Sequence, residues 1–275
     1  MAHESRGPVG KMNTTSPHPM NIGVIILGNR ESLRNPRLLS VHPAPKFVSP
    51  VYLSADYRPS LRQLFLEFIL NGKFLTNGER GCSLAHQNIR NQILNSSHEW
   101  TLVLEDDAGV SDDWLEKVCR EFPQFPNNVL PSLILFNSNP YIDIGPGAKP
   151  LHIRPSTTSS FLVHRAALEA RSQIQLDPFQ IADWPCSFAL TQFWIMSNIS
   201  FDLKLESTIG PRKTRRLMSV LSALIQGVMS PVFSRIAGVP LRIYLSWCVI
   251  GPLKRDLTLR WRNMVSRFAI QDKKS

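Results

Sequence analysis

Short apolar runs that alternate with amphipathic segments are the feature that most constrains the fold of this chain. Runs typical of buried strands cover 21–28, 100–107, 132–137 and 159–163, and a weaker candidate at 46–56 contains Pro50. Helical apolar spacing appears between them, at 59–70, 82–94, 112–122 and 164–174. This alternation predicts an α/β fold with a mostly parallel sheet and crossover helices. In such sheets, ligands bind beyond the carboxyl ends of the strands.

Composition places the chain among globular proteins. Its 275 residues suit one α/β domain with an appendage, and 43% of them are hydrophobic. The four cysteines are scattered without CxxC spacing, so neither a structural zinc site nor a disulfide framework is indicated. Reduced thiols in a cytosolic compartment are the simplest interpretation.

The positive charge is concentrated at the C-terminal end. Residues 211–275 carry a net charge of +11, whereas the rest of the chain carries −1. Arginines interrupt apolar stretches in this segment, which favours attachment to the surface of an anionic membrane. The alternatives are a helical subdomain that packs on the body and a nucleic-acid surface, although no nucleic-acid-binding motif accompanies the charge. We therefore expect no nucleic-acid partner.

Three regions follow from these patterns. Residues 1–19 contain Pro, Ser and Thr without an apolar core, so they are expected to be a disordered leader rather than a signal peptide or an anchor. Residues 20–210 hold the alternating strands and helices of the predicted domain. Residues 211–275 form the basic, apolar, helical segment that is expected to contact the membrane surface.

The strand at 100–107 ends in three adjacent carboxylates, Glu105, Asp106 and Asp107. Such carboxylates repel one another unless a positive charge neutralises them, and Mg²⁺ or Mn²⁺ prefers oxygen ligands. A metal held here would neutralise the pyrophosphate of a nucleotide substrate. The alternative is a solvated acidic turn that caps the next helix, and Asp112 and Asp113 are assigned to that helix-start role.

The order "NGERGCSLAHQNI" and then "LVLEDDAGV" resembles glycosyltransferase family 25, the lipooligosaccharide and procollagen galactosyltransferase family. Members show a GExGCxxSH segment followed by an "LEDD" strand end. Here Ala85 replaces the family serine, and "VIILGNR" replaces a first strand that usually reads "VINLDR". Supporting matches are "SAD", "TTSSFLVHRAALEA", "ADWP" and "ESTI", so the resemblance spans roughly residues 20–210.

The resemblance implies a GT-A-like, Rossmann-type fold and an inverting, metal-dependent transfer from a nucleotide sugar, with UDP-galactose as the expected donor. Asp107 would ligate Mn²⁺ or Mg²⁺ together with Glu105. Glu105 or Asp106 would also hold the ribose or a metal-bound water, and Asp56 would contact the nucleoside. The implied acceptor is a glycan such as lipooligosaccharide, so we expect a cytoplasmic enzyme, peripheral on the inner face of the membrane.

Further residues are assigned with open alternatives. Inverting transfer needs a base, and Asp183 is the candidate, with Trp184 as an apolar platform for a sugar; the alternative for Asp183 is a helix cap before Pro185. Arg30 is a candidate phosphate or base-side contact, as is Arg34. Glu79 and His86 could orient the donor, although His86 on an amphipathic helix also fits a structural residue.

The departures in the first strand leave a second functional hypothesis. Ile26 and Gly28 stand where the family has Asn and Asp, and this displaces the register of Arg30. A catalytically inactive relative that binds a glycan or a partner is therefore the alternative to an active transferase.

Overall fold

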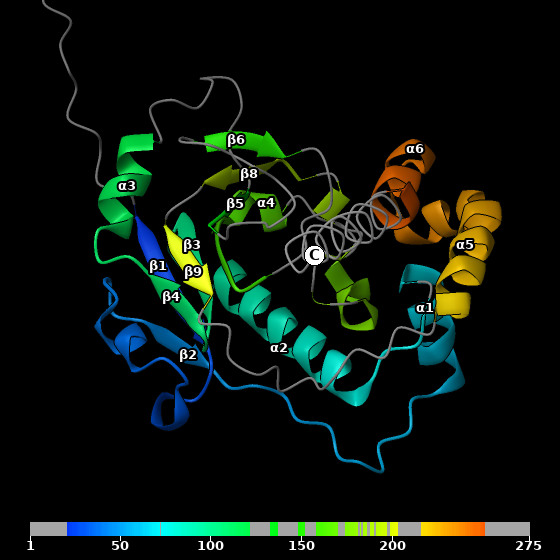
Figure 1. Ribbon diagram of the computed structural model, residues 1–275, viewed down its shortest axis with the longest axis horizontal. Coiled ribbons are helices and arrows are strands. Elements are labelled where there is room, and N and C mark those ends of the chain that lie inside the picture. Colours follow the sequence, from blue (N-terminus) through cyan, green and yellow to red (C-terminus); the bar gives the residue numbers. More distant parts are fainter. Residues whose placement is uncertain are drawn as a thin grey trace, which may run out of the picture.

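A mixed seven-stranded sheet forms the centre of the computed structural model (Figure 1). The structure describes residues 21–71, 73–121, 133–136, 148–151, 158–169, 174–180, 182, 184–185, 188–189, 191–196, 199–202 and 216–250. Within them the strands lie in the order β2-β1-β3-β7-β5-β8-β6. Their bounds are β1 Ile22–Leu27, β2 Lys46–Val48, β3 Trp100–Glu105, β5 Leu133–Leu135, β6 Ala148–Leu151, β7 Ser160–His164 and β8 Phe193–Met196. A separate pair joins β4 (Ala108–Val110) to β9 (Ser200–Asp202).

Strands β1 and β3 are the buried centre of this sheet. They pair in parallel from Ile22 opposite Trp100 to Leu27 opposite Glu105. Every residue of β1 is buried, because apolar side chains leave both faces of the strand. The two strands end level with each other, so Gly28 and Asp106 emerge side by side at one edge of the sheet.

The prediction of a mostly parallel sheet is confirmed, because five of the seven described strands run in the same direction. The two exceptions are β7, which runs antiparallel to both of its neighbours, β3 and β5, and β6, which runs antiparallel to β8. A parallel return would need a crossover, usually a helix, whereas residues 137–157 contain four prolines and two glycines. As a consequence, the start of β7 lies at the same edge as the ends of β1 and β3.

Helices cover both faces of the sheet. Helix α2 (Asn77–Leu94) packs its buried Ile89 and Ile93 against one face, together with α4 (Arg165–Glu169). On the opposite face, Trp114 and Val118 of α3 (Trp114–Glu121) join the apolar residues of β1 and β3. Two short 3-10 turns, η1 (Arg30–Ser32) and η2 (Pro36–Ser40), connect β1 to β2. The result is a sheet between two layers of helices, as the alternating pattern predicts.

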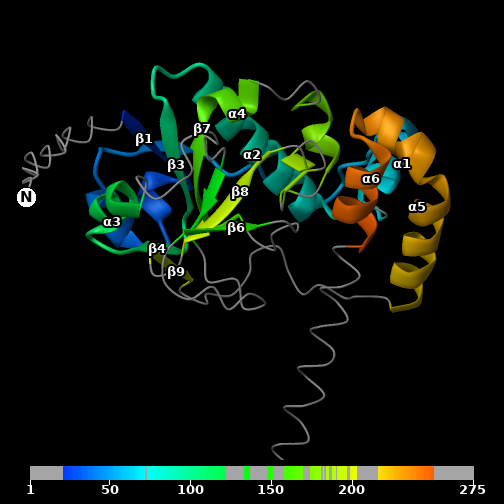
Figure 2. The ribbon, with the colours of Figure 1, turned by 90° about the horizontal axis from the view of Figure 1, so that it is seen from above.

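The C-terminal helices pack against the body of the protein (Figure 2). Helix α5 (Arg216–Ala237) contacts α1 (Leu61–Asn71), which also contacts η4 (Ile174–Phe179). After α5 come α6 (Leu241–Tyr244) and a π-helical turn, η6 (Leu245–Ile250). Tyr244 is fully buried, and its hydroxyl donates to the carbonyl oxygen of Ile69 at 3.1 Å.

In the part of the chain that the structure describes, no single helix has the length and hydropathy of a membrane span. One bent pair, Leu224–Ala237 with Leu241–Trp247, meets the criteria jointly, and its two halves are bent by 118°.

Candidate functional site

The carboxyl edge of the sheet gathers the acidic side chains that the sequence singles out. Strand β3 ends at Glu105, and Asp106 and Asp107 form the turn into β4. Thr158 reaches the same edge because β7 runs in the opposite direction. The candidate site is therefore built from the end of β3, the loop after β1, the start of β7 and helix α2.

Glu105 is held by two neighbours. Thr158 Oγ1 donates to Glu105 Oε1 at 2.7 Å, and His86 Nε2 of α2 lies 3.3 Å from the same oxygen. Burial alone would raise the pKa of Glu105, but the bonds from His86 and Thr158 and the charge of Arg34 outweigh it, so the pKa lies below the ordinary value. The carboxylate is fixed in its charged form, with its side chain 28% exposed.

Asp106 and Asp107 share one cation. Arg34 Nη1 donates to Asp107 Oδ2 at 3.1 Å and lies 4.0 Å from Asp106 Oδ1. Burial raises the pKa of Asp106, and the charge of Glu105 adds to this effect, while Arg34 opposes it. Arg34 thus supplies the compensating positive charge that three adjacent carboxylates require.

The loop after β1 fixes the position of the acidic turn. The backbone N–H of Asn35 donates to the carbonyl of Asp106 at 2.9 Å, and its side chain donates to the carbonyl of Ala108 at 2.7 Å. A Cβ at Gly28 would come within 2.9 Å of Asp106 Cβ, closer than real Cβ contacts. Gly28 is therefore required here by close approach, and this explains why an aspartate cannot occupy this position in this geometry.

The "GER" part of the motif caps α2. Thr76 is the N-cap, and its side chain and that of Glu79 form a reciprocal capping box. Glu79 also binds Lys73, and although burial raises the pKa of Glu79, the bonds from Lys73 and Thr76 bring it below the ordinary value. The structure thus places Glu79 in a helix cap, and its contact to a donor stays a prediction.

The following two motif residues join α2 to its surroundings. Arg80 Nε and Nη2 donate to the two carboxylate oxygens of the buried Glu67 on α1, at 2.7 and 2.9 Å. A Cβ at Gly81 would lie 2.1 Å from the carbonyl oxygen of Val51, so the backbone approach here admits only glycine. These contacts set the position of the helix that carries His86 to Glu105.

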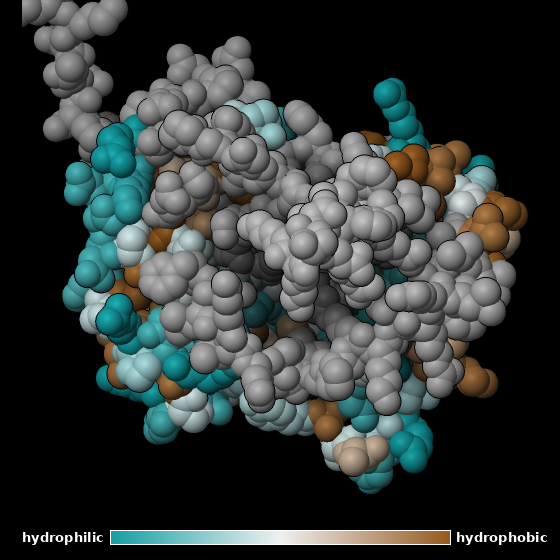
Figure 3. Space-filling model, viewed as in Figure 1, coloured by the Kyte–Doolittle hydropathy of each residue, from teal (hydrophilic) through white to brown (hydrophobic). Residues whose placement is uncertain are grey.

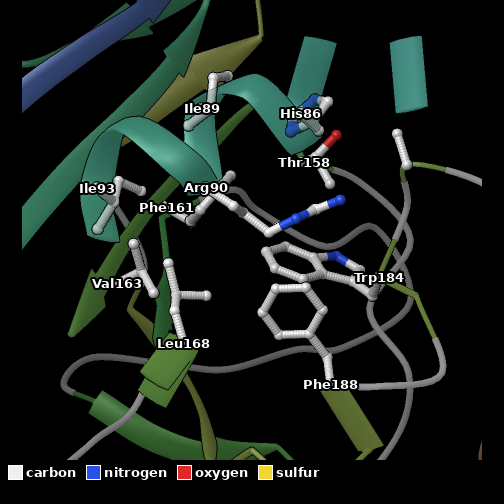
Figure 4. Close-up of a pocket in the computed structure, with 11 residues that line it drawn as sticks. His86, Ile89, Arg90, Ile93, Thr158, Phe161, Val163, Leu168, Trp184 and Phe188 are labelled. Carbon is white, nitrogen blue, oxygen red and sulfur yellow. The ribbon is translucent and has the colours of Figure 1, made fainter. Parts of the chain in front are cut away.

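A small cavity lies behind Glu105, and Figure 4 shows the side chains that line it. Its volume of about 10 Å³ is room for one water molecule. His86 and Thr158 line it on the side of Glu105, and Arg90, Trp184 and Phe188 close it. The cavity is therefore too small for a sugar.

Arg90 is the buried cation of this cavity. Its Nε lies 3.1 Å from Asp177 Oδ2, but neither Nε nor Nη2 makes a well-aligned hydrogen bond. Burial lowers the pKa of Arg90, and the charge of Asp177 only partly offsets this. The guanidinium also lies 5.8 Å from the ring centroid of Phe188.

Trp184 has a different role from the one expected. Its side chain is 1% exposed and makes edge-to-face contacts with Phe161, Phe188 and Phe193, so the prediction of a sugar platform is wrong. Its φ of 61° is rare for a residue with a side chain. The indole N–H of Trp247 donates to its carbonyl at 3.3 Å, so the C-terminal helices hold this conformation.

The remaining predicted site residues lie apart from this cluster. Arg30 is exposed on η1, and Asp56 is exposed in the loop between β2 and α1, where the Ser54 hydroxyl lowers its pKa. Asp183 lies outside the described residues. Among the residues that the structure describes, no group of three or more His, Cys, Asp or Glu side chains could hold a metal ion. Asp112 and Asp113 directly precede α3, as the helix-start assignment predicts.

Two residues of the cluster carry little signal in the sequence. Thr158 lies in a run of serines and threonines, and only the reversed direction of β7 brings it to Glu105. Arg34 is one of three arginines after β1, and its selection depends on the turn at Asn35. The sequence indicates Thr158 and Arg34 only indirectly, because three adjacent carboxylates need hydrogen-bond donors and a cation nearby.

Comparison with known proteins gives one match. Residues 60–133 match the family model of glycosyltransferase family 25, described as an LPS biosynthesis protein. This segment contains α1, α2 and the acidic turn after β3, so the match confirms the family resemblance over the two principal motifs, "NGERGCSLAHQNI" and "LVLEDDAGV". No curated protein matches the chain.

Proposed function

We propose that the chain, whose residues 60–133 match the glycosyltransferase family 25 model, transfers galactose from UDP-galactose to a hydroxyl of a glycan acceptor. The acceptor class is lipooligosaccharide. The observation that carries this proposal is the cluster of Glu105, Asp106 and Asp107 at the carboxyl edge of the sheet, inside the matched segment. In α/β sheets this edge is where nucleotide ligands bind.

Arg34 is the residue that favours a diphosphate at this edge. Its guanidinium already neutralises Asp107 at 3.1 Å and is 22% exposed, so one side of it faces solvent. Arginine binds phosphate oxygens through two parallel N–H groups. Arg30 lies on the same loop and is exposed. We propose that Arg34 contacts the diphosphate of the donor and that Asp56, Glu79 and Asp106 contribute to the rest of the donor site.

A divalent metal is part of the proposal. The carboxylate oxygens of Asp107 and Glu105 are donors of the kind that Mn²⁺ and Mg²⁺ prefer, and one or two carboxylates with substrate phosphates suffice for such an ion. The bound ion would supply positive charge against the leaving diphosphate. Arg34 would compete with the ion for Asp107, because its guanidinium donates to Oδ2 of that carboxylate.

The acceptor hydroxyl needs a base, and we propose Asp183 for this role. Its neighbour Trp184 has φ near 61° and is fixed by the Trp247 indole and by three phenylalanine rings. Backbone strain of this kind persists where the surroundings over-determine it, and it clusters at functional sites. Trp184 therefore acts as the anchor beside Asp183 rather than as a surface for the sugar.

The test is metal-dependent turnover of a panel of nucleotide sugars by the full chain. We expect hydrolysis or transfer of UDP-galactose with Mn²⁺, and a loss of at least 100-fold for Asp107→Asn. The matched control is Asp113→Asn, since the Asp113 side chain is 52% exposed and its described ion pair is with Lys117 of the helix that follows it, at 2.9 Å. Unchanged turnover of Asp107→Asn would refute the proposed site.

An inactive, donor-binding relative is the second candidate. The observation that favours it is the ion pair of Arg34 with Asp107, which occupies the oxygen that a metal would need. Binding of UDP-galactose without turnover across a broad set of acceptors would support this candidate. Turnover of any nucleotide sugar would exclude it.

We also propose that the protein works in the cytoplasm, peripheral on the inner face of the membrane. The support is the basic, apolar segment of residues 211–275 and the lipid-linked nature of the proposed acceptor.

A further inference from the structure

Helix α5 turns a row of apolar side chains outward. Its outward side chains are Leu224, Val228 and Val232, which are 62%, 77% and 49% exposed and four residues apart. Spacing of four residues places side chains on one face of a helix. Water-facing helices of soluble proteins normally turn charged or polar residues outward, so this face is built for a surrounding other than water.

The inward face of α5 includes three polar side chains. Gln226, Ser230 and Ser234 are 3–5% exposed and are also four residues apart. The hydroxyls of Ser230 and Ser234 donate to carbonyls of their own helix, at Gly227 and Pro231. These bonds satisfy the buried hydroxyls without a partner from the body. Phe233 and Ala237 also face inward and belong to the apolar core, so the inward face is mixed, while the row of exposed apolar side chains runs along the outer face.

Helix α1 adds to this apolar surface. Leu61 and Phe65 lie one turn apart and are 85% and 61% exposed, and Phe74 after the helix is 58% exposed. Helices α1 and α5 contact each other, and Figures 1 and 2 both show them side by side. In Figure 3 one group of hydrophobic side chains lies along the side that α5 and α6 form. We call Leu61, Phe65, Phe74, Leu224, Val228, Met229, Val232, Leu241 and Ile250 the outer apolar face.

This face holds most of the apolar side chains that the described structure exposes. Nine of the twelve large hydrophobic residues classed as exposed belong to it, so the exposure is not scattered evenly as on an ordinary soluble surface. Leu39, Tyr52 and Leu115 lie elsewhere.

The charges beside the outer apolar face are positive. Arg62 is exposed on α1, and Arg235 and Arg242 are exposed at the junction of α5 and α6, whereas Lys73 after α1 is paired with Glu79. The sequence of 216–250 contains no acidic residue, and Glu67 of α1 is fully buried against Arg80. Apolar side chains bordered by arginine complement anionic headgroups above acyl chains.

We infer that the outer apolar face lies in the headgroup region of an anionic bilayer, with α5 along the membrane plane. A helix of this length would cover about 33 Å of surface at 1.5 Å per residue. The inference rests on the proposed function in one respect, since a lipid-linked acceptor explains why a transferase would dock there. The contacts from α5 to α1, and from Glu67 to Arg80 of α2, join the docked face to the site at Glu105.

The experiment is flotation of the full chain with vesicles of phosphatidylglycerol and phosphatidylcholine, compared with phosphatidylcholine alone. The test variant is Val228→Glu/Val232→Glu, whose positions are exposed enough to accept a charge in water. The matched control is Leu115→Glu on α3, 36% exposed and outside the face. We expect the double variant to bind the anionic vesicles at least tenfold more weakly, and the control to bind like the wild type.

Three outcomes would overturn the inference: equal flotation of the double variant, equal binding of the wild type to neutral vesicles, or a wild-type dimer in light scattering that the double variant converts to a monomer. The last outcome would assign the face to a second copy of the chain. Hydrolysis of UDP-galactose in solution tests the site separately. If the wild type floats with anionic vesicles but hydrolyses no UDP-galactose, the proposed transferase activity is refuted and the docking face stands.

Discussion

Replacement of Arg80 by Met is expected to remove a large part of the stability of the protein. Arg80 donates to both oxygens of Glu67 at 2.7 and 2.9 Å, and the Glu67 side chain is completely buried. Removing one partner of a buried pair leaves an uncompensated charge and costs about 3–5 kcal/mol. Gln63 Nε2 and the Leu75 N–H still donate to Glu67 at 3.0 and 3.1 Å, so we expect the lower half of that range.

The expected loss translates into a measurable shift of the melting temperature. For domains of roughly 150–250 residues, 1 kcal/mol corresponds to about 2–4 °C, so Arg80→Met should melt about 6–16 °C lower. Arg80→Lys keeps the charge but loses the two-pronged bond, so an intermediate shift is expected. The double variant Glu67→Gln/Arg80→Met should recover part of the loss, because no charge then remains buried.

Urea unfolding followed by circular dichroism measures these differences directly. The reasoning would be refuted if Arg80→Met lost less than about 1 kcal/mol, the value for an exposed ion pair. It would also be refuted if Glu67→Gln/Arg80→Met were less stable than Arg80→Met. Either result would mean that Glu67 reaches water in a way that the buried geometry excludes.

Two further predictions concern the motif glycine and the acidic turn. Gly81→Ala should lower soluble expression and the melting temperature by more than Gly227→Ala, because its Cβ would lie 2.1 Å from a backbone carbonyl whereas nothing lies near the Cβ position of Gly227; equal melting temperatures would contradict the close approach. The lowered pKa of Glu105 means that its charged form stabilises the fold above the ordinary carboxyl pKa of about 4 and that this contribution is lost as the pH falls below it, while the raised pKa of Asp106 has the opposite sign. Glu105→Gln should therefore cost more unfolding free energy at pH 7 than at pH 3, and Asp106→Asn less, in urea titrations at the two pH values; the same sign for both variants would contradict the assignment.

Features with a local cause could be predicted from the sequence. The strands at 22–27 and 100–105 carry apolar runs, and β1 and β3 form there. Thr76 and Glu79 have the spacing of a capping box, and α2 begins there. The acidic turn is at the carboxyl edge because a buried strand immediately precedes it. Periodicity and capping are encoded within a few residues, so one sequence suffices to find them.

Features that depend on distant pairing could not be predicted in this way. The direction of β7 is fixed by pairing with β3 and β5, and Thr158 reaches Glu105 only through that direction. Trp184 could equally face a ligand or the core from its sequence, and three phenylalanines and Trp247 decide for the core. The pairing of Arg34 rather than Arg30 with Asp107 depends on the hydrogen bonds of Asn35.

The contacts of Tyr244 and Trp247 have a consequence for how the chain can be divided. Net charge changes sharply after residue 210, but the same apolar core continues across that point, since both aromatic side chains belong to the cluster that contains Ile69 and Trp184. A protein that ends at residue 210 would expose the apolar surface that Tyr244 and Trp247 cover, and it would lose the hydrogen bond that holds the backbone at Trp184. The near-neutral region before residue 210 and the basic region after it therefore fold as one unit. Loss of membrane binding in a shortened chain would reflect a damaged core as well as a missing membrane contact.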